Sequence, residues 1–180
     1  MSLLKNITLP AICALVAVFG APPRLVAESA AGLKWTAPAG WVSKGPAPFR
    51  IVTYAVPATS GPDKSECIVY FFGPGQGGTV EANMNRWKSQ FTRNGRPSPG
   101  TMSKELVHGI TVTMLDISGV YAAGGGMAQE GAGPSPDYRM IASVAEGPGG
   151  NIFIRFIGPA KSVAAGMDGF RKLVGSLQRQ

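Results

Sequence analysis

The N-terminal thirty residues most constrain what this chain can fold into. A short basic start, Met1 to Lys5, is followed by an apolar run from Ile7 to Phe19, and small residues are frequent from Gly20 to Ala31. This order is typical of a cleavable export signal. Ala27-Glu28-Ser29 places small residues at the two positions that a signal peptidase reads. We therefore expect residues 1–30 to be a signal peptide that is removed.

Two other interpretations of this segment are disfavoured. A membrane anchor needs about 20 apolar residues to cross the hydrocarbon core, and the run here is shorter. A lipoprotein signal would end in a cysteine, whereas Cys13 lies inside the apolar run. With the signal removed, we expect residues 31–180 to form a single globular α+β domain without a membrane span, periplasmic or secreted.

A single cysteine, Cys67, remains outside the signal, so the folded chain cannot form an internal disulfide. The apolar residues that follow it, Ile68 to Phe72, predict a central strand. An unpaired cysteine in such a strand behaves as a small buried hydrophobic side chain. The core must therefore hold the fold without a covalent cross-link.

The chain is basic, with a formal net charge of +7. This charge favours anionic partners such as lipid headgroups, wall polymers or acidic proteins, and it is compatible with a contact at an envelope surface. The cations are scattered and form no run of five or six, which is also what an ordinary solvated surface looks like. We expect no nucleic-acid partner.

Hydrophobic periodicity predicts strands, a helix, more strands and a second helix. The first helix is expected over Thr79–Arg93, because Thr79 can cap it and its apolar residues recur at helical spacing. The strands follow one another through short turns, so the sheet should be mainly antiparallel, with a helix available for each face. We expect an α/β/α sandwich of α+β type. The predicted strands are 34–38, 50–56, 66–72, 102–107, 110–121, 138–145 and 151–157, and the second helix is 162–177.

Glycine marks the predicted turns. Gly109 is expected in a hairpin turn, and the segment 146–150 in a second one. Asn94 to Pro97 should end the first helix, and the stretch from there to Gly100 is predicted as loop. The long segment 122–136, with three glycines at Gly124 to Gly126, is predicted to be a mobile loop that contacts a partner or covers a pocket.

The glycine-rich segment Gly73 to Gly78 joins a predicted strand to the first helix. It fits the G-x-G-x-x-G pattern of dinucleotide sites, but the parallel βαβ unit that this fingerprint requires is not predicted here, and export argues against a nucleotide. We expect no cofactor. Amides at the start of a helix can still hold a carboxylate or phosphate, and a polar stripe runs along the helix beside its apolar face. The candidate ligand or partner edge is Gly75, Gln76, Gly77, Gly78, Asn83, Arg86 and Gln90.

The alternative for this edge is structural. Buried amide side chains tend to bond backbone groups. Asn83 and Gln90 would then hold neighbouring loops in place, while Arg86 would be solvated.

Candidates for catalysis are few, because His108 is the only histidine. A hydrolase would pair Asp116 or Glu81 with His108, and a nucleophilic triad would need Cys67, His108 and Asp116. No local signature supports either set, so we assign no catalytic residue and expect no metal site.

Two further side chains have alternative placements. Asp116 is predicted on the wet face of its strand or paired with a cation such as Arg139 or Arg155. Trp41 is the one tryptophan expected to be exposed, because it follows Pro38-Ala39-Gly40 in a turn-rich stretch.

Four short motifs resemble the Mog1/PsbP-like superfamily: Pro38 to Trp41, the strand 68–72 running into Gly73 to Gly78, the helix segment Asn85 to Phe91, and Gly158 to Lys161 before the last helix. The resemblance spans nearly the whole chain after the signal. It implies an antiparallel sheet flanked by helices. The superfamily includes a GTPase-binding protein, photosystem extrinsic subunits and bacterial envelope proteins, so it implies no single function and no catalytic residues.

The sequence thus predicts an exported, non-enzymatic binding or accessory protein of the cell envelope. Its expected partner is a protein or a small anionic ligand. The alternatives are an envelope hydrolase that uses Asp116 or Glu81 with His108, and a purely structural role.

Overall fold

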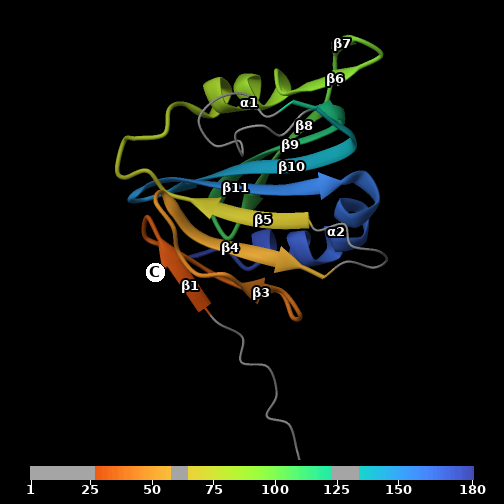
Figure 1. Ribbon diagram of the computed structural model, residues 1–180. Coiled ribbons are helices and arrows are strands. Elements are labelled where there is room, and N and C mark those ends of the chain that lie inside the picture. Colours follow the sequence, from red (N-terminus) through yellow and green to blue (C-terminus); the bar gives the residue numbers. More distant parts are fainter. Residues whose placement is uncertain (1–26, 58–64, 123–133) are drawn as a thin grey trace, which may run out of the picture.

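The centre of the structure is a long hairpin of two neighbouring strands, which pair from Tyr138↔Pro159 to Gly147↔Gly150. The computed structural model describes residues 27–57, 65–122 and 134–180. Its elements (Figure 1) are β1 (Ala27–Ala30), β2 (Leu33–Thr36), β3 (Val42–Ser43), β4 (Arg50–Val56), β5 (Ser65–Tyr70), α1 (Val80–Lys88), β6 (Phe91–Arg93), β7 (Arg96–Pro97), β8 (Thr101–Val107), β9 (Ile110–Tyr121), β10 (Ser135–Gly147), β11 (Gly150–Pro159), α2 (Ala160–Gly175) and β12 (Gln178–Arg179).

The main sheet has nine strands, in the order β3-β4-β5-β11-β10-β9-β6-β7, and β8 also pairs with β9. Every strand pair in it is antiparallel. A small sheet, β1-β2-β12, brings the end of the chain beside β2, near the start of the described residues (Figure 1). The predicted α+β class with a mainly antiparallel sheet and two helices is confirmed.

Alternation along the strands separates the side chains into two clusters. One cluster contains Val163, Phe170 and Leu173 of α2 together with Ile141 and Ile154 of the sheet. We call this side of the sheet the α2 face. The other cluster contains Met84 and Trp87 of α1 with Leu115, Met140 and Phe153, and we call this side the α1 face. In Figure 1, α1 lies above β9–β11, and α2 lies behind β4 and β5.

The first helix is shorter than predicted. Thr79 caps it as expected, because its hydroxyl accepts a hydrogen bond from the Ala82 amide at 3.1 Å. The helix ends at Lys88 rather than Arg93. Phe91 is fully buried, as its helical spacing suggested, but it reaches the core from strand β6.

An additional hairpin follows that helix. Asn94 and Gly95 both have positive φ, 52° and 72°, and connect β6 to β7 through a two-residue turn. Asn-Gly is the strongest short signal for such a turn. The prediction that Asn94 to Pro97 ends the first helix was therefore wrong, because the same two residues also end helices, whereas the stretch 98–100 is a loop as predicted.

Other turns are as predicted. His108 and Gly109 form the two-residue turn between β8 and β9, with Val107 paired to Ile110. Pro148 and Gly149 close the β10–β11 hairpin. The predicted loop with Gly124 to Gly126 lies mostly outside the described residues.

Trp41 is not the exposed tryptophan that its turn-rich surroundings suggested. It is half-buried, and its ring lies 5.9 Å from Tyr54 and 5.6 Å from Phe156, centroid to centroid. Gly169 of α2 makes this packing possible, because a Cβ there would lie 2.9 Å from the indole. Trp41 therefore belongs to the edge of the core.

The segment predicted at the signal cleavage site is structured. Ala27–Ala30 forms β1 and pairs with β2, with Glu28 opposite Trp35. Cleavage after Ser29 would remove most of this strand. None of the helices within the described parts of the chain is long and apolar enough to cross a membrane.

Two glycines of α2 give opposite expectations when changed to alanine. A Cβ at Gly166 would lie 2.5 Å from Cζ of Phe156, whereas a Cβ at Gly175 meets nothing within 4 Å. Alanine is the better helix former. We expect Gly166→Ala to lower the free energy of unfolding by about 1–3 kcal/mol through overpacking, and Gly175→Ala to raise it by about 0.5 kcal/mol. Urea unfolding measures both, and equal effects would contradict the packing of α2 on Phe156.

Candidate functional site

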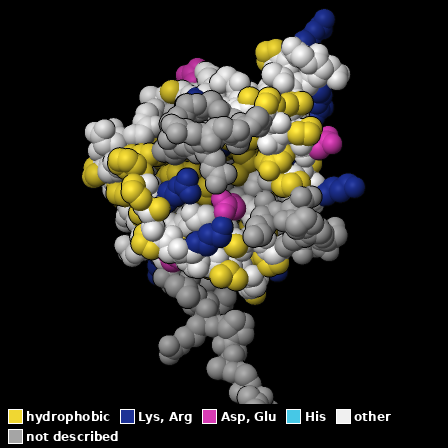
Figure 2. Space-filling view, in the orientation of Figure 1, with side chains coloured by type: hydrophobic (Ala, Val, Ile, Leu, Met, Phe, Trp, Pro, Cys, Tyr) yellow, Lys and Arg dark blue, Asp and Glu magenta, His cyan; other side chains and the backbone are white. Residues whose placement is uncertain are grey.

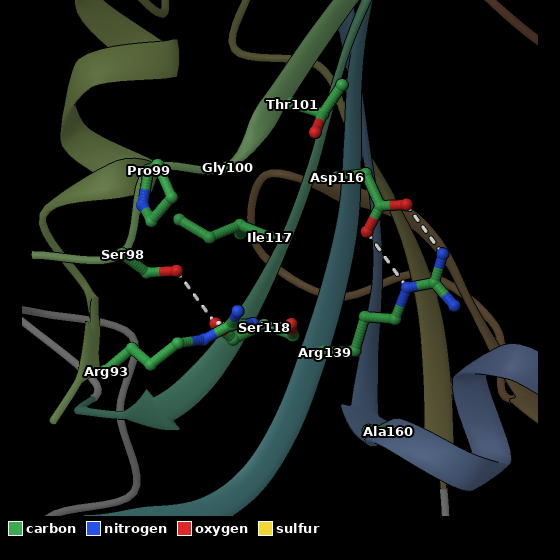
Figure 3. A pocket seen from close by; sticks show the side chains of 10 residues that line it. All are labelled: Arg93, Ser98, Pro99, Gly100, Thr101, Asp116, Ile117, Ser118, Arg139 and Ala160. Carbon is green, nitrogen blue, oxygen red and sulfur yellow. Dashed lines mark hydrogen bonds and ion pairs between the residues drawn. The ribbon is translucent and has the colours of Figure 1, made fainter.

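The α2 face carries two adjoining cavities. One, of about 430 Å³, lies where β9, β10 and the segment before β8 meet the start of α2 (Figure 3). The other, of about 510 Å³, lies between β8, β9 and α2. Both are lined by Thr101 and Asp116. They therefore form a single groove, which we call the α2 groove.

An ion pair marks the junction of the two cavities. Arg139 donates from Nε and Nη2 to the two carboxylate oxygens of Asp116, at 2.9 and 2.6 Å. The two residues are diagonal neighbours, because Asp116 pairs with Ile141 and Arg139 with Ser118. The hydrogen bonds to Asp116 raise the pKa of Arg139. Of the two partners considered for Asp116 from the sequence, the structure has Arg139 and not Arg155.

A second arginine lies at the outer end of the groove. Arg93 of β6 donates from Nη2 to the Ser118 hydroxyl at 2.7 Å, and its side chain is exposed. Ser98, which is only 5% exposed, donates to the Ser118 carbonyl at 2.8 Å and holds the chain before β8 against β9 (Figure 3). This end therefore presents a guanidinium and hydroxyl groups on a firm support.

The start of α2 adds to the positive character of this end. Ala160 lines the cavity, and the N-cap residue Pro159 provides no side-chain hydrogen bond. The first turn has no acidic residue. The amides and the dipole of a helix start favour negative charge.

The inner end of the groove is largely apolar. Its sheet side comes from the strands β8 to β10, and its other side comes from one face of α2. The apolar side chains that line it are Val107, Met114, Ile141, Met167, Phe170 and Val174. The groove thus has a cationic end and an apolar end, joined at the Asp116–Arg139 pair.

The residues proposed from the sequence lie on the other side of the sheet. Asn83 is buried, and its amide nitrogen donates to the carbonyls of Gly77 and Thr79 at 2.7 and 2.9 Å. Arg86 is exposed and donates to Asn83 Oδ1 at 2.6 Å. The structural role considered for Asn83, holding a neighbouring loop, is therefore observed.

The remaining members of that set separate. Gly75, Gln76 and Gly78 lie at the surface of the loop. Gly77 packs on the core, since a Cβ there would lie 2.6 Å from Phe153. Gln90 lies beyond α1, where its Oε1 accepts a hydrogen bond from Arg155 at 3.4 Å. Ligand binding at these residues stays a prediction.

The groups considered for catalysis are not brought together. Glu81 lies in the first turn of α1, and the Asp116 carboxylate faces the α2 groove. His108 Nδ1 lies 2.9 Å from the Leu177 carbonyl oxygen, in the turn before β9. Asp116 lies six residues beyond the start of β9 at Ile110, which is about 20 Å of strand. Cys67 is fully buried, and burial raises the pKa of its thiol. In residues 27–57, 65–122 and 134–180, no three His, Cys, Asp or Glu side chains cluster as metal ligands would.

Comparison with known proteins gives a match by structure and not by sequence. No model of a known protein family matches the sequence, and no curated protein sequence does. The structure matches that of cyanobacterial PsbP (CyanoP) from Synechocystis sp. PCC 6803 with a TM-score of 0.53 and 16% identity, over 93% of this chain and 98% of that one. The chain has a PsbP/Mog1-like fold. A protein of unknown function from Pseudomonas aeruginosa, PA94, is similar to this PsbP-like chain with a TM-score of 0.51 and 11% identity, over 87% of this chain and 97% of that one.

Sequence reasoning missed most of the groove of this PsbP-like domain. Asp116 was noticed because a charge interrupts an apolar strand, and Arg139 was named as its partner. Arg93 and Ser98 were assigned to a helix end and a loop, so nothing placed them near Ser118. The Asn-Gly turn between β6 and β7 is the signal that could have done so, because it turns the chain back along β6.

The hydrogen bonds of Asn83 lead to a stability prediction. Asn83→Ala removes both bonds to the glycine-rich loop and leaves the Gly77 carbonyl without its partner. We expect the free energy of unfolding to fall by about 1–3 kcal/mol. Asn85 is exposed on the same helix, so Asn85→Ala should have little effect. Thermal unfolding of the two variants measures the difference, and equal melting temperatures would contradict the role of Asn83.

Proposed function

We propose that this chain is an exported, non-enzymatic binding protein of the cell envelope. Its sheet, sandwiched between α1 and α2, would hold a small anionic ligand with an apolar body in the α2 groove. The observation that carries the proposal is the junction of a cationic cavity with an apolar one at Thr101 and Asp116. A carboxylate or phosphate with a hydrocarbon body matches both ends.

Charge supports an anion at the outer end. Arg139 is already neutralised by Asp116, with both carboxylate oxygens bonded. Arg93 makes no ion pair within the described residues, and its bonds are to a hydroxyl and a carbonyl. An anion at Arg93 would form charge-assisted hydrogen bonds, which are about twice as strong as neutral ones. Arg93 is therefore the cation that a ligand would use.

The same ion pair supports a binding role over a hydrolytic one. A general base must be free to accept a proton within hydrogen-bond reach of a substrate. Both oxygens of Asp116 are engaged by Arg139, and the Glu81 carboxylate lies on α1. Binding needs no such group.

A protein partner is the second candidate, and the edge strand β8 favours it. All residues from Thr101 to Leu106 are exposed, and Met102 and Leu106 are 47% and 73% exposed. An exposed edge strand with apolar side chains can pair with an extended segment of another chain. Such a segment would lie along the rim of the α2 groove.

Decanoate is a suitable probe of the groove, with decanol as its uncharged counterpart. We expect decanoate to bind, and Arg93→Gln to weaken binding about tenfold, which corresponds to about 1.4 kcal/mol. Lys172→Gln makes the same charge change on an exposed residue of α2 outside the groove, and it should leave the affinity unchanged. Isothermal titration calorimetry measures each case.

Two results of this titration would contradict the ligand proposal: absence of decanoate binding, and equal affinities for the two variants. A third variant, Ser103→Phe, places a large side chain in the apolar end from exposed strand β8. Loss of decanoate binding in this variant locates the hydrocarbon body. Retained binding would place the ligand elsewhere.

Export has its own test. We expect the chain recovered from the envelope fraction to begin at Ala30 or Ala31, because the signal features of residues 1–30 end there. Intact mass spectrometry of that chain measures the start. A chain that keeps Met1 to Phe19 would contradict a cleaved signal, whereas a start at Ala27 would keep the whole of β1.

A further inference from the structure

We propose a second binding site on the α1 face, centred on Arg155, for an aromatic carboxylate. Arg155 lies in the middle of β11, a central strand of the main sheet. It pairs with Ala142 of β10 on one side and Ile68 of β5 on the other. Both neighbours belong to the α1-face cluster, so Arg155 lies on that face, half-buried among apolar side chains.

The hydrogen bonds of Arg155 are weak and go to neutral groups. Its Nη2 lies 3.4 Å from Gln90 Oε1 and 3.3 Å from the Tyr121 hydroxyl, and its Nε lies 3.3 Å from the Met140 sulfur. Charge-assisted bonds to a carboxylate are typically about 2.7–2.9 Å. Arg139, one strand away, makes such bonds at 2.9 and 2.6 Å. The guanidinium of Arg155 thus has donor capacity that its present partners do not satisfy.

No carboxylate neutralises this cation within the described parts of the chain, where the ion pairs involve Lys44, Arg139 and Arg171. Glu66, which lies on the same face, is paired with Lys44. A partly buried charge without a counter-charge is unfavourable, and binding an anion relieves this cost. A planar carboxylate fits the fork of a guanidinium.

Aromatic rings beside Arg155 favour a flat ligand body. Tyr121 and Tyr138 are stacked, with centroids 5.9 Å apart and planes 7° apart, and Phe91 lies 5.1 Å from Tyr121. Rings of this kind bind another aromatic ring by stacking or edge contacts. Figure 2 shows a hollow on this side of the molecule with hydrophobic side chains on its floor and charged groups beside it.

A second cation lies on the same face. Arg50 stands over the ring of Tyr70, 5.8 Å from its centroid. Register and strand spacing place the Cα atoms of Arg50 and Arg155 about 12 Å apart. Arg50 therefore adds to a positive potential that draws anions toward this face.

The test compares 2-naphthoate with its neutral counterpart 2-naphthamide, by titration calorimetry and by the NMR signals of the arginine side-chain Nε–H groups. We expect naphthoate to bind at Arg155, and the amide to bind there at least about tenfold more weakly. Arg155→Gln should weaken naphthoate binding about tenfold, and Arg155→Lys should weaken it less, because it keeps the charge and loses the fork. In the wild type, the Arg155 Nε–H signal should shift on titration.

The matched control is Arg93→Gln, which makes the same charge change in the α2 groove on the other face. It should leave naphthoate binding unchanged, while Arg155→Gln should leave decanoate binding unchanged. The two proposals can therefore fail separately. Three results would overturn the site: absence of naphthoate binding, equal binding of the amide, or an Arg155 Nε–H signal that does not shift. The NMR shift is measured on the wild type, so it does not depend on whether a variant folds.

Discussion

The antiparallel ladder of β9, β10 and β11 is the interaction on which the rest of the structure depends. Its register is continuous from Tyr138 to Gly147 on the β11 side, and from Tyr138 to Ala145 on the β9 side. A shift by one residue would exchange the two faces of every strand. The ladder therefore decides which side chains meet α1 and which meet α2. It also puts Asp116 and Arg139 on one face and Arg155 on the other.

Three arginines on this ladder and its edge illustrate how position sets chemistry. Arg139 has a bidentate carboxylate partner. Arg93 rests on serine groups at the exposed rim, and Arg155 has only long contacts to neutral acceptors. The side chain is the same in each case, but the counter-charge differs. A ligand carboxylate gains most where the protein has supplied none.

The glycine-rich loop carries a pattern known from nucleotide sites, yet its observed contacts are internal. Gly77 has a φ of 88° and approaches Phe153 too closely for any side chain. Asn83 reaches back from α1 to the Gly77 carbonyl. These two contacts fix where α1 begins on the sheet, and so they position the aromatic and apolar floor of the α1 face.

The sequence by itself determined the α+β class, the strands β4 and β9 with their exact ends, the Thr79 cap, both long hairpin turns and the burial of Cys67. These features depend on hydrophobic periodicity and local backbone preference, and both can be recognised within a short stretch of sequence. It also named Arg139 as a partner for Asp116. Only the tertiary structure decided that Asn94-Gly95 turns the chain into β6 and β7, that Trp41 packs on the core, and that Arg93 meets Ser118 while Arg155 meets Gln90 and Tyr121. Those contacts join residues far apart in the chain, and their formation depends on strand order and register, which local patterns do not encode.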